Sequence, residues 1–272
     1  VSRKIVRVLV PALIFMVLYL SMNWFVRKMV YPSPPIRVSS PPPKPFQEVW
    51  LEAGSSKKIG AWYYEASDHN APALVYFHGN GENLQTLRQS GLLDSLIDLK
   101  ISFLALDYPG YGRSHGTPSE DSIQEAAYAA VRWMDTKHPD SLLISCGWSL
   151  GAAVAINAAS KQQDIVDGLI AMSVWSSLQD AAREHFPKWM VQSLLQESYD
   201  CLSAAKTVSK PALFIHGQKD TLIPAEQGKK VADAMKGNVR WVLLPNTSHN
   251  DLLARQQVWR EIKSFLNSLP QN

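Results

Sequence analysis

Residues 142–160 read LLISCGWSLGAAVAINAAS and place a serine between an apolar strand and an alanine-rich helix. The motif Gly147-Trp148-Ser149-Leu150-Gly151 fits G-x-S-x-G, in which small residues two before and two after the serine make room for a sharp turn. Such a turn lifts the Ser149 hydroxyl above the sheet and points it at the N-terminus of the following helix. We therefore predict that Ser149 is a nucleophile.

A serine nucleophile requires a base, and the base requires an orienting carboxylate. Three histidines follow Ser149 in the chain. His185 falls in a helical stretch and looks exposed, and His216 ends a strand and is expected to support its turn. His249 lies in a loop just after an apolar strand, as this architecture requires of the base. We predict that His249 is the base.

The orienting acid is expected between the serine and the base in the chain, on a loop after a strand. Asp220, in the segment His216-Gly-Gln-Lys-Asp220, meets both conditions. Asp251 lies too near His249 in sequence and is expected to cap the last helix instead. Asp220 is therefore the predicted acid.

The loop His78-Gly79-Asn80-Gly81 follows an apolar strand and precedes a helix. A dinucleotide-binding loop would need a third small residue for helix–strand packing where Leu84 stands, so no NAD site is expected. The glycines permit turns that bring an N–H group toward the nucleophile. We predict that the N–H of Asn80 and that of Leu150, which directly follows the serine, form an oxyanion hole.

Strand-like and helix-like patterns alternate through the body of the chain. Continuous apolar strands separated by helical patterns of about 10–15 residues indicate a parallel sheet covered on both faces. In such a sheet, functional loops gather at the carboxyl ends of the strands. The eight strand-like runs are 46–53, 59–65, 73–78, 101–107, 141–147, 166–173, 211–217 and 239–244.

The N-terminus differs from the body. The run 8–26 has no charge and would span about 28 Å as a helix, close to the ~30 Å hydrocarbon core of a bilayer. Basic residues flank both its ends, and Trp24 and Tyr31 stand where aromatic side chains prefer a membrane–water interface. A cleavable signal peptide would have a shorter apolar region and a small-residue cleavage site, and a core helix would not carry flanking charges. We predict a membrane anchor over residues 1–30.

The positive-inside rule slightly favours a cytoplasmic N-terminus, which would place the body on the non-cytoplasmic side. The proline-rich residues 31–45 are expected to form a semi-extended spacer. Seven basic residues and no acidic ones precede Glu48, whereas the remainder carries 20 basic and 24 acidic residues. Since that remainder offers no basic footprint, a nucleic-acid partner is not expected. The two cysteines lack metal-ligand spacing, and no metal or cofactor is implied.

Taken together, these motifs resemble the α/β-hydrolase fold serine hydrolases, and more narrowly their membrane-anchored ABHD-type branch. The resemblance covers about residues 46 to 268 and implies an α/β fold. In that fold a mostly parallel eight-stranded sheet has helices on both faces and a short cap, with one transmembrane helix before it. The implied division is a hydrolase domain at 46–272 with its cap at about 175–208, and the family's nucleophile, acid and base fall on the three residues predicted above. The matching motifs are HGNGEN (78–83), DYPGYGRS (107–114), GWSLG (147–151), HGQKD (216–220) and SHND (248–251).

The expected activity is cleavage of carboxylic esters or thioesters, of acyl or lipid type, through an acyl-enzyme. A membrane-anchored serine peptidase or amidase and a non-catalytic membrane-tethered scaffold remain alternatives, and the oligomeric state is not predicted. Phe186 and Trp189 in the cap are candidate substrate contacts, either in an apolar lid over an acyl pocket or in packing on the sheet edge. Trp148 is a third candidate, which either narrows the acyl site or only packs beside it.

Overall fold

The computed structural model describes residues 3–33, 41–54, 57–68 and 70–270. Its strands form one eight-stranded sheet in the order β1-β2-β4-β3-β5-β6-β7-β8. The strands are β1 (Gln47–Ala53), β2 (Lys57–Tyr64), β3 (Ala73–Phe77), β4 (Ser102–Leu106), β5 (Leu143–Trp148), β6 (Gly168–Met172), β7 (Ala212–Gly217) and β8 (Val239–Leu244).

Strand β2 pairs antiparallel with β1 and with β4, and all the other pairs are parallel. Strands β3, β4, β6 and β7 are buried along their whole length, as expected for parallel strands covered on both faces. The predicted α/β class and mostly parallel eight-stranded sheet are therefore confirmed. In the centre, Phe77 of β3 pairs with Gly147 of β5, so the loops that follow these two strands lie side by side.

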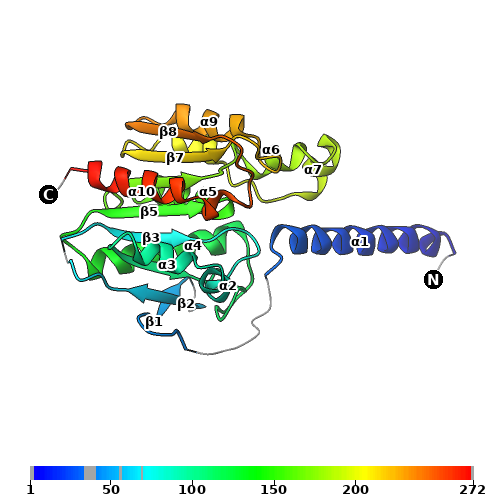
Figure 1. The fold of residues 1–272 in the computed structure, drawn as a ribbon. Coiled ribbons are helices and arrows are strands. Elements are labelled where there is room, and N and C mark those ends of the chain that lie inside the picture. The colour runs from blue at the N-terminus through cyan, green and yellow to red at the C-terminus, as the bar shows by residue number, and fades with distance from the viewer. Residues whose placement is uncertain (1–2, 34–40, 55–56, 69, 271–272) are drawn as a thin grey trace.

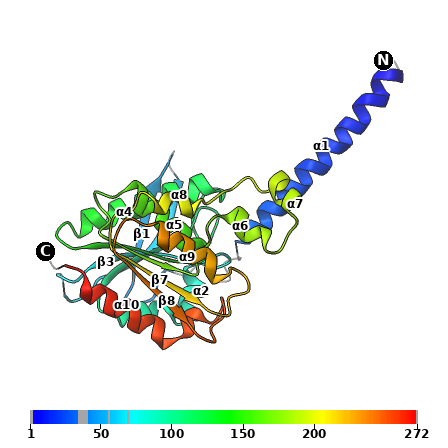
Figure 2. The same ribbon diagram turned by 90° about the horizontal axis from the view of Figure 1, so that it is seen from above.

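Helices cover both faces of the sheet (Figures 1 and 2). Neighbouring residues of one strand serve different faces. Val75 belongs to the core cluster that contains residues of α4, α5, α8 and α9, whereas Tyr76 belongs to the cluster that contains residues of α2, α3 and α10. The helical pattern predicted after β3 is interrupted at Gly91, whose φ of 76° separates two short helices. The helices are α1 (Arg3–Val30), α2 (Leu84–Gln89), α3 (Leu92–Ile97), α4 (Glu120–Lys137), α5 (Leu150–Lys161), α6 (Leu178–Arg183), α7 (Lys188–Leu194), α8 (Cys201–Ala205), α9 (Ala225–Ala234) and α10 (Gln256–Ser268), with a short 3₁₀ helix at Leu252–Ala254.

Helix α1 extends away from the body, and α7 lies beside its C-terminal end (Figures 1 and 2). Large apolar side chains along α1 are exposed, among them Leu13, Leu20 and Phe25. In the part of the chain that the structure describes, no helix has both the length and the hydropathy of a segment that crosses a bilayer. The predicted transmembrane helix is therefore not confirmed.

The first residues after α1 pack against the body. Tyr31, expected at a membrane–water interface, is only 1% exposed, and its hydroxyl lies 2.9 Å from that of Tyr199. That expectation was wrong because Tyr31 joins the hydrophobic core on the α4–α5 side of the sheet. Within the predicted spacer 31–45, residues 34–40 lie outside the described residues.

Candidate functional site

Ser149 stands in the turn between β5 and α5, at the carboxyl edge of the sheet. Its backbone has φ 56° and ψ −117°, which is strained for a residue with a side chain. A Cβ atom on Gly147 would collide with the carbonyl oxygen of Gly151, and one on Gly151 would collide with the carbonyl oxygen of Phe77. Glycine at both positions is thus a steric requirement of the turn, as the motif predicts.

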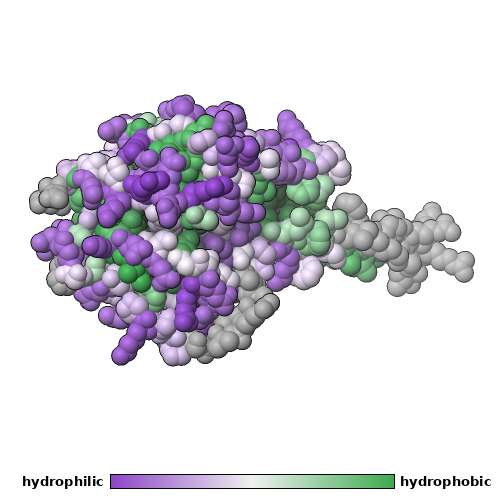
Figure 3. Space-filling model, in the orientation of Figure 1, coloured by the Kyte–Doolittle hydropathy of each residue, from purple (hydrophilic) through white to green (hydrophobic). Residues whose placement is uncertain are grey.

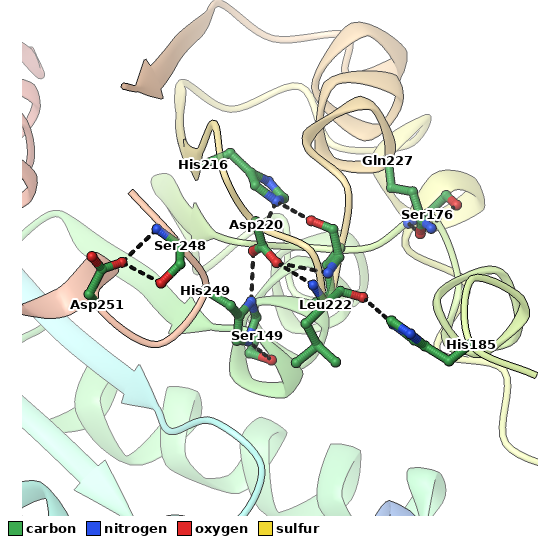
Figure 4. A network of polar contacts seen from close by, with 11 residues as sticks. Ser149, Ser176, His185, His216, Asp220, Leu222, Gln227, Ser248, His249 and Asp251 are labelled. Carbon is green, nitrogen blue, oxygen red and sulfur yellow. Dashed lines mark hydrogen bonds and ion pairs between the residues drawn. The ribbon is translucent and has the colours of Figure 1, made fainter. Parts of the chain in front are cut away.

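The structure brings Ser149, His249 and Asp220 together from three loops far apart in the chain (Figure 4). His249 Nε2 lies 3.1 Å from Ser149 Oγ, and His249 Nδ1 lies 2.7 Å from Asp220 Oδ2. All three residues are at most 6% exposed. An ionised carboxylate only accepts hydrogen bonds, so Nδ1 carries the proton and Nε2 presents its lone pair to the serine hydroxyl.

Asp220 is held by backbone N–H groups as well as by imidazole. Its Oδ1 accepts hydrogen bonds from the N–H groups of Leu222 (3.0 Å) and Ile223 (2.8 Å). Burial acts to raise the pKa of Asp220, but hydrogen bonds from His216 and His249 outweigh it and hold the pKa well below its usual range. The carboxylate therefore stays ionised at neutral pH.

His216 supports the turn after β7, as expected, because its Nε2 donates to the carbonyl of Ile223 at 2.9 Å. The same Nε2 lies 3.4 Å from Asp220 Oδ2. This second imidazole beside the acid was not predicted. The signal was in the segment HGQKD, where the histidine at strand end and the aspartate flank one tight turn.

The other two polar residues considered from the sequence do not contact Ser149. His185 is exposed, as expected, and its Nε2 donates to the carbonyl of Leu222 at 2.9 Å, which ties the cap to the acid loop (Figure 4). Asp251 was expected to cap the last helix, and this was wrong. Its Oδ1 instead accepts from the N–H (2.6 Å) and hydroxyl (2.7 Å) of Ser248, and it makes no cap bond to the 3₁₀ helix that follows. Asp251 therefore fixes the turn that carries the base.

Asn80 and Leu150 line the same cavity as Ser149. Within the described residues, neither backbone N–H of this pair has a hydrogen-bond acceptor in the protein, so both are available to a ligand. The side chain of Asn80 is fixed by Tyr111, whose hydroxyl donates to Asn80 Oδ1 at 3.0 Å. Tyr111 belongs to the motif DYPGYGRS and braces the loop after β3.

Glu82 closes the other side of that loop. One of its carboxylate oxygens accepts a hydrogen bond from the N–H of Gly79 at 2.7 Å. Burial raises the pKa of Glu82 to about 7, and the hydrogen bond from Gly79 only partly opposes this rise. The loop that carries Asn80 is therefore braced by a carboxyl group that titrates near neutral pH.

The cavity above Ser149 has a volume of about 280 Å³ and a mainly apolar lining. Phe186 lines it, whereas Trp148 and Trp189 do not. Trp148 packs against the His249 imidazole, with 5.1 Å between ring centroids, so ordinary packing accounts for it. Trp189 lies on the outside of α7 and is 69% exposed.

Three lining residues come from the end of α1 and were not predicted: Val26, Met29 and Val30. No local pattern distinguishes them from the rest of the apolar run.

Among the described residues, no group of three histidine, cysteine or acidic side chains is arranged to hold a metal ion.

The sequence profile of the α/β hydrolase fold matches residues 72–193. The chain is 30% identical over 225 residues to protein Rv2307c of Mycobacterium tuberculosis, covering 81% of this chain and 79% of that protein. It is 29% identical over 202 residues to the lysophosphatidylserine lipase ABHD12 of Danio rerio, covering 68% of this chain and 52% of that lipase.

Among solved structures, the Pyrococcus furiosus esterase Pf2001 is similar with a TM-score of 0.70 at 21% identity. The match covers 87% of this chain and 97% of the esterase, and at this identity it concerns the fold. The sequence profile, the relative at 30% identity and the shared fold agree. The chain belongs to the α/β-hydrolase fold family and is a hydrolase.

Proposed function

We propose that the protein is a serine hydrolase that cleaves carboxylic esters or thioesters of acyl or lipid type. One observation carries the proposal: the Ser149 hydroxyl lies 3.1 Å from His249 Nε2 at the base of a mainly apolar cavity. An imidazole whose other nitrogen is held by an ionised carboxylate is a general base for such a hydroxyl. The mainly apolar lining of the cavity supports a substrate of acyl or lipid type.

The proposed reaction is a two-step acyl transfer. His249 takes the proton of Ser149 as Oγ attacks the carbonyl carbon, and Asp220 stabilises the imidazolium that forms. The N–H groups of Asn80 and Leu150 donate hydrogen bonds to the oxyanion. His249 then protonates the leaving alcohol or thiol, and a water molecule, activated by the same imidazole, hydrolyses the acyl-enzyme.

An acyl or lipid substrate is further supported by the relative from Danio rerio, whose name describes a lysophosphatidylserine lipase. We also propose that α1 associates with a membrane, as in the ABHD-type branch. The exposed apolar side chains of α1, such as Leu20 and Phe25, support this association. Because basic residues flank both ends of the apolar run, we further propose that the catalytic domain lies on the non-cytoplasmic side of the membrane.

A panel of p-nitrophenyl esters of graded chain length, run beside aminoacyl anilides, tests the proposal. We expect ester turnover in the wild type and its loss in Ser149→Ala, together with loss of labelling by a fluorophosphonate probe. Ser203→Ala is the matched control, because Ser203 is exposed on α8 and does not line the cavity. Preferential turnover of the anilides would indicate a peptidase or amidase. Equal labelling of wild type and Ser149→Ala would refute the nucleophile.

A further inference from the structure

The end of α1 belongs to the cavity that contains Ser149. Val26, Met29 and Val30 have the i, i+3, i+4 spacing of one helix face, and all three line the cavity. Phe25, one turn before Met29, does not line the cavity and is 55% exposed. One face of α1 is thus a wall of the site, and Arg27 in the same turn donates a hydrogen bond to the carbonyl of Pro118 in the body.

This wall is fixed to the catalytic body. The hydroxyl groups of Tyr31 and Tyr199 form a buried hydrogen bond of 2.9 Å, which joins the residue after α1 to the segment before α8. Ser33 donates a hydrogen bond from its hydroxyl to the carbonyl of Gly110. Because these contacts follow α1 directly, the position of its last turn relative to Ser149 is set by the body.

The cap supplies a second part of the lining. Phe186, Met190 and Leu194, in and just before α7, line the same cavity, and α7 contacts α1. Figure 3 shows hydrophobic side chains gathered over the α6–α7 part of the surface, beside the point where α1 leaves the body. Trp189, exposed on this part, is of the type that prefers a membrane–water interface.

From these observations we infer that the last turn of α1 is part of the acyl-binding site, and that this site takes a lipid with one acyl chain, which enters between α1 and α7 from a lipid surface. The inference rests on the proposed function. The cavity volume of about 280 Å³ lies just below the ~300–1,000 Å³ range of ligand pockets, which suits one chain rather than two. The apolar walls lead from the exposed surface of α1 and α7 to the serine, so a chain along them brings its ester group to Ser149.

Substitutions in the wall test the first half of the inference. Val26→Trp fills the cavity and Met29→Ala enlarges it, whereas Phe25→Trp adds the same indole at a neighbouring position that does not line the cavity. The full chain in detergent micelles is assayed on p-nitrophenyl acetate, hexanoate and dodecanoate. Val26→Trp is expected to lower the dodecanoate-to-acetate ratio of kcat/KM about tenfold, the effect of excluding roughly two methylene groups. Met29→Ala is expected to raise that ratio, and Phe25→Trp to leave it as in the wild type.

Opposite shifts in Val26→Trp and Met29→Ala cannot arise from a general loss of stability, which would reduce turnover of every ester. If the wild type hydrolyses the esters and both wall variants keep its chain-length profile, the inference is wrong while the proposed function stands. If the wild type hydrolyses none of the esters or lipids, the proposed function itself fails.

Presentation of the substrate tests the second half. Dodecanoyl glycerol, a lipid with one acyl chain, is offered in phosphatidylcholine vesicles, and the rate is divided by that on p-nitrophenyl acetate in solution. Trp189→Ala is expected to lower this ratio several-fold, because it removes an exposed interfacial aromatic side chain beside the entry. Ser203→Ala, at an exposed position of α8 that does not line the cavity, serves as control. An unchanged ratio in Trp189→Ala would show that the chain does not enter from the lipid surface at α7.

Discussion

Replacing Asp220 with asparagine separates the charge of the acid from its shape. The amide oxygen of asparagine can take the place of Oδ1, which accepts from the N–H groups of Leu222 and Ile223. The amide nitrogen then replaces Oδ2, which accepts from His249 Nδ1 at 2.7 Å. Because an amide nitrogen donates, His249 must accept at Nδ1 and carry its proton on Nε2. That proton faces the Ser149 hydroxyl, and the imidazole can no longer act as a base.

The cost to catalysis is expected to exceed the cost to stability. Loss of a hydrogen bond to a charged group lowers the free energy of unfolding by about 1.5–3 kcal/mol. The wrong tautomer lowers kcat by about 10⁴-fold, which corresponds to about 5.5 kcal/mol of transition-state stabilisation. The variant should therefore be folded and nearly inactive.

The assay is kcat on the preferred p-nitrophenyl ester, with the free energy of unfolding measured on the same preparations. Asp251→Asn is the matched control. It lies two residues from His249, and its amide oxygen can accept the same bonds from Ser248, so its kcat should stay within about twofold of the wild type. If folded Asp220→Asn keeps more than a tenth of the wild-type kcat, the assignment of Asp220 as the orienting acid is refuted.

Three further changes test the turn, the oxyanion loop and the end of α1. Gly151→Ala forces a Cβ against the carbonyl of Phe77, so urea unfolding should show a free energy of unfolding about 1–3 kcal/mol below that of the wild type. We also expect a lower kcat, because the loop after β3 shifts. A wild-type free energy of unfolding together with a wild-type kcat would contradict the steric argument. Because burial raises the pKa of Glu82 from 4.5 to about 7, the folded protein loses stability as the pH rises through this range. Glu82→Gln removes this loss, so its free energy of unfolding should exceed that of the wild type by about 2 kcal/mol more at pH 8 than at pH 5. A difference in the free energy of unfolding that does not change with pH would exclude the titration of Glu82. Tyr31→Phe leaves the Tyr199 hydroxyl buried without its partner and should lower the free energy of unfolding by about 1–3 kcal/mol. Most of this loss should be recovered when Tyr31 and Tyr199 are both replaced by phenylalanine. If the losses of the two single variants simply add in the double variant, the two hydroxyl groups are not coupled.

Sequence reasoning succeeded where the relevant information is local. The apolar runs of β3, β4, β6 and β7 are buried on both faces, which is why they could be recognised without any alternation of polar residues. The turn at Ser149 could be predicted because its geometry excludes side chains at two fixed positions. Strand ends in a parallel sheet share one edge, and this brought residues of three separate loops into one predicted cluster.

It failed where a contact depends on packing between distant segments. Tyrosine is a residue type that is common at membrane–water interfaces, but the burial of Tyr31 depends on Tyr199, which is 168 positions away in the chain. Asp251 precedes a helical stretch, as a capping residue does. Its Oδ1 instead accepts two hydrogen bonds from Ser248, which leave it no cap bond to the helix. A residue type shows which contacts are possible, and the tertiary fold selects among them.

The same limit applies to the apolar run of α1, for which we propose two roles. Association with lipid requires only that apolar side chains be exposed, and Leu20 and Phe25 meet that requirement. Lining a pocket requires side chains on one face of the helix and at one position along its axis. Val26 and Met29 meet this requirement only because the residues after α1 pack on the body. A segment that serves both roles places the nucleophile within reach of the lipid around the helix. Removing α1 would then change which esters are cleaved as well as where the protein is held, and chain-length preference after removal of residues 1–30 distinguishes such a wall from a simple tether.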